Sequence, residues 1–283
     1  MAIERRFSFI LGVDLGGGRG KKTALAVLRP DERGCALVVD VAPASGASPF
    51  YDRALIRAVR AHPDDTLLCV DAPLTLPPCL RCQVGVCPGQ RDCVDPAVVA
   101  MGGMVPAMSG GRDARRGKPG FTPYTQRVTE VYLAQVTGIG FRETLGQSTG
   151  PLAARAAHVV RALADRFQLN RNLIEIYPKG TLHSLGFRRP YKKHLRERET
   201  RAEILHALSP ELGFAPGVWR EQCIQSDHIF EAVIAAYTGF LWGRDAWELP
   251  NAVASIVARD GWIWIPPATL DATAAQSARV AGG

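Results

Sequence analysis

The sequence has no apolar run that approaches the roughly 20 residues a membrane-spanning helix needs. Its first residues, MAIERRFSFILGVDLGG, include a short apolar run but no small-residue cleavage site. Because that run ends in an aspartate and glycines, we interpret it as a strand and not as a signal peptide. A Walker-type nucleotide loop is also excluded, since no Gly-Lys-[Ser/Thr] stands at the required spacing. We therefore expect a cytoplasmic protein with no membrane partner.

No internal repeat divides the 283 residues, and 47% of them are hydrophobic, enough to build a sizeable core. We predict a single domain over residues 1–267, followed by a small, polar, disordered tail over 268–283. The net charge is +7, and much of the basic charge falls in residues 110–118 and 187–201. Each basic run alone suits a solvated surface, but two runs flanking one site would favour contact with a nucleic-acid backbone.

The pattern of apolar segments predicts an α/β fold. Three strands with short links, at residues 7–13, 23–29 and 35–42, indicate an antiparallel meander. A helix within 49–62 and a strand over 66–73 follow, the strand expected to run parallel to its neighbour. Residues 74–123 show no period and are rich in Gly, Pro and Cys, which is typical of an insertion. Further helices are expected within 124–136, 150–167, 198–208 and 226–245, with strands over 172–178 and, at an edge, 261–266.

This order predicts a ribonuclease H-like mixed sheet with helices on both faces and a Cys-rich insertion after the fourth strand. In such a sheet the first and fourth strands are neighbours. Residues at their carboxyl ends should therefore meet at one edge.

Four acidic residues stand where this sheet would gather them. Asp14 closes the first strand and Asp71 closes the fourth. Glu175 lies between isoleucines in LIEIYP, and Asp227 begins a helix that carries Glu231 one turn further on. Carboxylates packed together repel unless a cation lies between them, and hard oxygen ligands suit Mg²⁺ or Mn²⁺. We predict catalytic roles for Asp14, Asp71, Glu175 and Asp227, with Asp14, Asp71 and Asp227 as metal ligands.

Each acid also has a simpler interpretation. Asp14 and Asp71 could start turns, and Asp227 could cap its helix, a role that Ser226 could take instead. Glu175 should point away from its apolar neighbours on the strand, so either that face is wet or the acid has a partner.

Five short motifs between residues 9 and 243 resemble a known family. They are GVDLGG, VDAPLTLP, YTQRVTE, IEIYPKG followed by a Lys/Arg-rich helix, and SDHIFEAVIAAYTG. In order and spacing, the chain is similar to uncharacterised predicted nucleases with a ribonuclease H-like fold, the domain of unknown function 429. The resemblance implies a metal-dependent nuclease-like site that uses Asp14, Asp71, Glu175 and Asp227.

Arg127 and Glu130 of YTQRVTE also match the family pattern. Arg127 would suit a substrate phosphate, or would instead form a structural ion pair. Lys179, in IEIYPKG, is a second candidate for binding substrate phosphate.

Four of the seven cysteines lie within fifteen positions, as Cys79-x2-Cys82-x4-Cys87-x5-Cys93. In a cytosolic protein such a cluster indicates a metal more than disulfides. Four thiolates fit a [4Fe–4S] cluster or Zn²⁺ equally by count. We favour the iron–sulfur cluster, because zinc ligands more often come as two close pairs with a longer gap between them. Since the first cysteines closely follow Asp71, the centre should lie near the acidic site.

Together these features predict a divalent-metal-dependent nuclease that hydrolyses phosphodiester bonds of DNA or RNA. In the expected mechanism two ions activate water and stabilise the leaving oxygen. Asp14 bridges them, Asp71 and Asp227 each complete one, and Glu175 is a further ligand or orients water. Arg127, Lys179 and the basic helix hold the phosphate.

Two other classes remain open. An actin-like or sugar-kinase ATPase would use the glycines of GVDLGGGRGKKTALAVL as a phosphate loop. It would also need a second Asp-x-Gly loop, whereas Asp71 is followed by Ala72 and Pro73. A non-catalytic nucleic-acid-binding module would use the basic runs, with Lys21 and Lys22 after the glycine loop.

Overall fold

The computed structural model describes residues 7–17, 22–42, 50–108, 120–192, 196–217 and 219–267. Over these ranges the chain folds as a mixed α/β protein around one seven-stranded sheet. Lys21, the basic run at 110–118 and the tail predicted over 268–283 lie outside the described residues.

The strand order is β6-β3-β2-β1-β4-β5-β7. β2 is antiparallel to both β1 and β3, which confirms the predicted meander. The pairs β1–β4, β4–β5, β5–β7 and β3–β6 are parallel. The last strand lies at an edge, as the sequence predicts. The strands are β1 (Phe9–Asp14), β2 (Ala24–Pro30), β3 (Ala36–Ala42), β4 (Thr66–Asp71), β5 (Leu173–Ile176), β6 (Leu212–Phe214) and β7 (Ile263–Trp264).

Ten helices occur in the described ranges, and none of them is both long and apolar enough to cross a membrane. They are α1 (Asp52–Arg60), α2 (Pro78–Arg81), α3 (Pro96–Met108), α4 (Val128–Thr137), α5 (Gly150–Ala162), α6 (Pro178–Ser184), α7 (Arg196–Ala207), α8 (Trp219–Gln225), α9 (Asp227–Arg244) and α10 (Ala254–Asp260). Helix α3 falls where the sequence shows no period, because its two glycines and a proline interrupt the apolar pattern.

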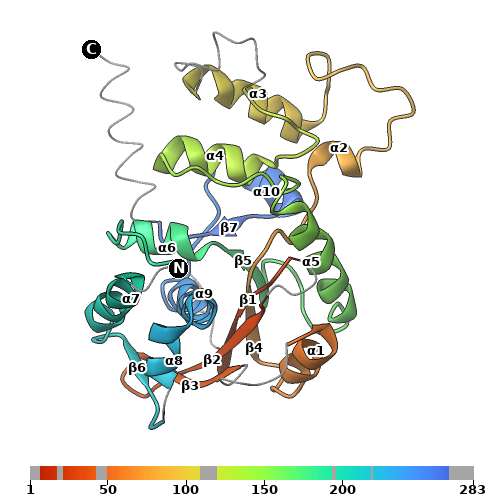
Figure 1. The fold of residues 1–283 in the computed structure, drawn as a ribbon. Coiled ribbons are helices and arrows are strands. Elements are labelled where there is room, and N and C mark those ends of the chain that lie inside the picture. Colours follow the sequence, from red (N-terminus) through yellow and green to blue (C-terminus); the bar gives the residue numbers. More distant parts are fainter. Residues whose placement is uncertain are drawn as a thin grey trace, which may run out of the picture.

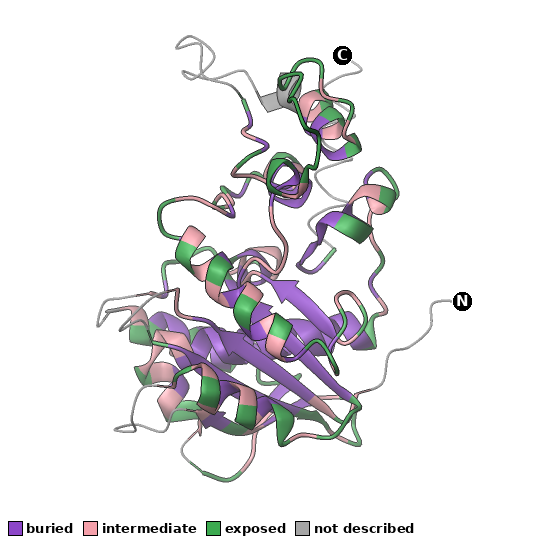
Figure 2. Cartoon of the chain, turned by 90° about the vertical axis from the view of Figure 1, so that its right-hand side faces the viewer, coloured by how far each residue is buried: buried purple, intermediate pink, exposed green. Residues whose placement is uncertain are grey.

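Helices cover both faces of the sheet (Figure 1). Helix α9 lies on one face, and α1 with α5 lies on the other. The central strands are therefore buried on both sides (Figure 2), which explains why β1 and β4 are nearly continuous apolar runs. Helix α9 is buried around its whole circumference from Ile229 to Gly243 and is mostly apolar there, because it is enclosed between the sheet and helices α6 and α8.

Two glycines let α9 approach the sheet closely. A Cβ added at Gly12 in β1 would collide with the backbone of Ala232 and Ala236 in α9. A Cβ added at Gly239 in α9 would collide with the sulfur of Cys69 in β4. Since no larger residue fits at either contact, these glycines determine how α9 seats over β1 and β4.

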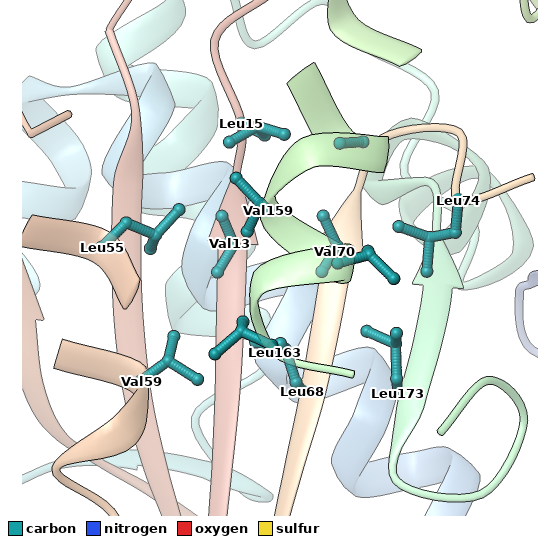
Figure 3. Close-up of a pocket in the computed structure, with 12 residues that line it drawn as sticks. Val13, Leu15, Leu55, Val59, Leu68, Val70, Leu74, Val159, Leu163 and Leu173 are labelled. Carbon is teal, nitrogen blue, oxygen red and sulfur yellow. The ribbon is translucent and has the colours of Figure 1, made fainter. Parts of the chain in front are cut away.

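The opposite face of the sheet packs against α1 and α5 through aliphatic side chains (Figure 3). The gap between them is a cavity of about 10 Å³, too small for a substrate. This layer is therefore core. Residues from the sheet and from the two helices line it, among them Val13, Leu68, Val70, Leu55, Val59 and Val159.

Candidate metal centre

Two aspartates meet at the carboxyl ends of the central parallel strands. In the parallel pairing of β1 with β4, Asp14 stands opposite Asp71. Both side chains lie on the α9 face, because Gly12 and Cys69, two positions earlier in each strand, contact α9. The sequence prediction that the first and fourth strands are adjacent is confirmed.

The third carboxylate comes from α9. Ser226 caps this helix by accepting a hydrogen bond from the Ile229 backbone N–H at 3.3 Å. One turn inside the helix, Glu231 is 4% exposed. One ligand atom from each of Asp14, Asp71 and Glu231 lies within 4.8 Å of the others. No other set of three His, Cys, Asp or Glu residues in the described ranges meets this distance.

Glu175 lies outside this acidic group because strand alternation turns it to the other face. It pairs with Val70, one residue before Asp71, and Val70 faces the α1 and α5 side. A shift of one residue along a strand reverses the direction of the side chain. Its carboxylate accepts a hydrogen bond from the Leu74 backbone N–H at 2.9 Å, so it supports the turn that follows Asp71.

Arg127 is fully buried and is the main partner of Glu175. Its Nη2 atom lies 2.6 Å from Glu175 Oε1 and 2.7 Å from Glu130 Oε1. Its Nη1 atom donates to Glu175 Oε2 at 2.7 Å and to Thr75 Oγ1 at 2.9 Å, and Nε donates to Glu130. These bonds use every nitrogen of the guanidinium. The structure thus gives Arg127 the structural ion pair that the sequence left open, with no donor directed to a phosphate.

Asp227 is the first residue of α9 and is half-buried. Its Oδ1 atom accepts a hydrogen bond from the His228 backbone N–H at 3.1 Å, a local contact at the helix start. It does not belong to the acidic group. Glu231 holds the place on this helix that the sequence assigned to Asp227.

The acidic group carries unfavourable negative charge. Burial raises the pKa of Asp71 well above its usual value, and the carboxylates of Glu231 and Asp14 raise it further. Burial also raises the pKa of Glu231, although Lys192 opposes the change. Within the described ranges no hydrogen bond or ion pair reaches the Asp71 carboxylate. Asp71 is half-buried, and with the buried carboxylates of Asp14 and Glu231 beside it forms a donor set that fits Mg²⁺ or Mn²⁺.

Two basic side chains lie against the group. Lys192 Nζ lies 2.6 Å from Glu231 Oε1, and the Tyr191 hydroxyl donates to the same oxygen at 2.9 Å. Burial lowers the pKa of Lys192, but the neighbouring carboxylates outweigh it and raise the pKa overall. His228 Nδ1 lies 2.6 Å from Asp14 Oδ2, and this hydrogen bond raises the pKa of His228. The Lys192 contact favours the charged, metal-binding form of Glu231.

A cleft of about 900 Å³ opens over the acidic group. Its size is that of a ligand-binding pocket. Besides Arg127 and two histidines, six basic residues line it, which we call the basic rim: Lys22, Arg142, Lys179, Arg188, Arg189 and Lys192. A cleft that contains both an acidic group and this basic rim suits a phosphate-bearing ligand that binds together with a cation.

The four clustered cysteines lie apart from this cleft. Cys79 is in α2, Cys82 directly follows it, and Cys87 and Cys93 lie in the loop that leads to α3. All four are free thiols, and none lines the cleft. Helices α2 and α3 lie at one end of the molecule, away from most of the sheet (Figure 1).

Three residues of the site are missing from the sequence prediction of function. Glu231 carries the clearest signal, because it is an acid in an otherwise apolar helix, one turn after Asp227. The sequence places Lys192 only in a general basic run. His228 has no signal beyond standing next to Asp227, since its partner Asp14 is more than 200 positions away.

The chain is thus a mixed α/β protein with a group of carboxylates where two parallel strands end. The chain belongs to the family described as "Protein of unknown function (DUF429)", which matches residues 12–254. This match confirms the resemblance to the domain of unknown function 429 at the level of the family, and the matched range contains the acidic group and the four cysteines. Comparison with curated proteins and with solved structures finds no match.

Proposed function

We propose that this protein is a divalent-metal-dependent nuclease with a ribonuclease H-like fold. The strand arrangement supports the fold, because β1, β2 and β3 form a meander and β4 returns parallel to β1. The observation that carries the function is the acidic group of Asp14, Asp71 and Glu231 in the same cleft as the basic rim.

In this proposal Asp14, Asp71 and Glu231 hold Mg²⁺ or Mn²⁺ through carboxylate oxygens. When bound, such a cation lowers the pKa of a coordinated water and stabilises charge on the leaving oxygen of a phosphodiester. His228 orients Asp14 through its 2.6 Å contact, and Lys192 with Tyr191 orients Glu231. Outer partners of this kind hold ligand side chains in one rotamer.

The basic rim binds the nucleic-acid backbone. Arg142, Lys179 and Arg188 are exposed and line the cleft, so their charges are available to phosphate oxygens. Exposed cations contribute non-specific affinity that falls as salt concentration rises. Arg127 acts differently, since its ion pairs hold the turn that carries Asp71.

The direct test is cleavage of labelled single-stranded DNA, duplex DNA and RNA by the full-length chain with Mg²⁺ or Mn²⁺, alongside calorimetric titration of the metal. Asp14→Asn and Glu231→Gln should each reduce cleavage by more than about 100-fold, because losing even an outer partner of a metal ligand typically costs about 10–100-fold. Asp245→Asn, at the far end of α9, is the matched control and should cleave normally.

Two results would overturn the proposal. In the first, the wild-type protein binds nucleic acid without cutting it, and Asp14→Asn binds it as well or better, which is the behaviour of a pure binding module. The other is cleavage that persists in both carboxylate variants or in excess chelator.

A further inference from the structure

The cysteine loop between α2 and α3 has the composition of a metal site and lies outside the cleft. Cys79 lies within the single turn of α2, and Cys82 is the C-cap of that helix, three residues further along the chain. The chain then returns through Cys87, which accepts a hydrogen bond from the Gly89 backbone N–H, to Cys93.

All four cysteines lie between the start of α2 and the start of α3, and the loop that joins them is exposed. Cys79, Cys82 and Cys87 are exposed and Cys93 is half-buried, so each thiol is accessible to a metal ion. No three of their sulfur atoms lie within 4.8 Å of one another in the described residues, so the centre requires this exposed loop to close around the metal.

The loop has no apolar core of its own. Of the seven exposed large hydrophobic residues in the described ranges, four lie on α2 or this loop and a fifth on the first turns of α3. Those five are Leu80, Val84, Val86, Val94 and Val99. A short segment that cannot bury its apolar side chains generally needs a crosslink or a metal to be stable.

Both ends of the loop are nevertheless anchored to the domain. Arg81 Nη2 lies 2.6 Å from Asp260 Oδ1, and the Cys79 backbone N–H donates to the Pro123 carbonyl at 3.2 Å. At the other end, Cys93 packs on the core, and Asp95 Oδ2 lies 3.7 Å from Arg259 Nη2 in α10. Anchored ends hold the four thiols together at a lower entropic cost than a free loop would.

We propose that Cys79, Cys82, Cys87 and Cys93 form a four-thiolate metal centre, separate from the acidic group, that crosslinks this loop. The centre holds either one Zn²⁺ or a [4Fe–4S] cluster, since four thiolate ligands suit both. Each thiol loses its proton to solvent when its sulfur binds the metal. The centre does not depend on the proposed nuclease activity.

The first measurement is metal, iron and acid-labile sulfide per chain on full-length protein purified without oxygen. One zinc in a colourless protein, or four irons and four sulfides with broad visible absorbance, supports the centre and identifies the metal. Absence of both metals, together with no binding of added Zn²⁺ by the fully reduced protein, would refute it. So would a thiol count showing these cysteines paired as disulfides in that preparation.

Variants assign the metal to these residues. Cys82→Ser and Cys87→Ser replace exposed side chains, so the domain should still fold while the metal falls from about one centre per chain to near zero. Cys35→Ser, outside the loop, and Asp14→Asn, in the acidic group, should keep it. Metal retained in both loop variants, or lost in Asp14→Asn, would show that the thiols are not the ligands.

Limited trypsin digestion gives a readout other than metal content. Arg91 lies exposed between Cys87 and Cys93, so a centre that closes the loop should slow cleavage there by at least about tenfold. A chelator with reductant should remove the protection in wild type and should change nothing in Cys87→Ser. Equal cleavage rates in untreated wild type, chelator-treated wild type and Cys87→Ser would contradict a crosslinked loop.

Discussion

Replacing Arg127 with methionine should destabilise the protein more than any exposed ion-pair change. Its guanidinium is fully buried between Glu130 and Glu175, each 3% exposed. Methionine fills much of the same volume but leaves both carboxylates without their cation. Removing one partner of a buried ion pair costs about 3–5 kcal/mol.

That loss is a large share of the roughly 5–15 kcal/mol that stabilises a typical folded protein. In urea, a slope of about 3 kcal/mol/M turns a loss of about 4 kcal/mol into a shift of the midpoint by roughly 1 M. Arg60→Met is the matched control, because Arg60 pairs with Asp165 at 2.7 Å with side chains 42% and 63% exposed. Exposed pairs contribute at most about 1 kcal/mol.

The loss of stability in Arg127→Met, relative to wild type, should depend on pH. Burial already raises the pKa of Glu130 with Arg127 present, and removing the arginine raises it further. A carboxyl whose pKa is higher in the folded state stabilises the fold below its unfolded pKa, and this contribution is lost as pH rises through the folded pKa. Arg127→Met should therefore lose more stability, relative to wild type, at about pH 8 than at about pH 5.

The assay is urea unfolding followed by circular dichroism at both pH values. A loss no larger than that of Arg60→Met, or a deficit that grows on acidification, would refute this account of the buried pair. The triple change Arg127→Met, Glu130→Gln, Glu175→Gln removes all three charges and should recover part of the loss.

Three further changes test the site and its support. Glu231→Gln should abolish Mg²⁺ binding in calorimetry while Asp227→Asn keeps most of it, and the reverse order would return Asp227 to the metal group. Because the pKa of Asp71 is raised without metal, Mg²⁺ affinity should fall as pH is lowered through that pKa, since protons then compete for the carboxylate; an affinity independent of pH would contradict this. Because the pKa of Asp71 is higher in the folded state, the metal-free protein should lose stability as pH rises through that pKa. Added Mg²⁺ should restore the stability in thermal melts. Gly12→Ala should lower the free energy of unfolding by about 1–3 kcal/mol or more, because the added Cβ would collide with α9. Gly103→Ala is the control: its Cβ would enter open space beside α3, so the change should be neutral or stabilising by up to about 1 kcal/mol.

Residues with a strong local signal were predictable from the sequence. Asp14 and Asp71 each end an apolar run that is long enough for a strand and too short for a helix. Parallel pairing of the two strands then places both carboxylates at the same edge. The expectation that Glu175 needs a partner or a wet face is also met, because Arg127 is that partner.

Short elements carried too little pattern. Strand β6 has three residues, and helices α8 and α10 have seven each. Such short segments do not show the apolar alternation of a strand or the apolar repeat of a helix clearly enough to be recognised. These elements form because other elements give them a surface to pack on: β6 pairs with β3 at the sheet edge, α8 packs on α9, and α10 packs on α4 and α3. Their positions are a tertiary result.

The amino-acid sequence alone predicts the mixed α/β class, the central strands and the two aspartates that end them, because apolar period and strand length are local properties. The third acid that joins those aspartates depends on tertiary contacts. The register of β5 against β4 turns Glu175 to the far face, and the close seating of α9 at Gly12 brings Glu231 to Asp14 and Asp71. Register and helix seating depend on contacts between residues more than a hundred positions apart, which no local pattern records.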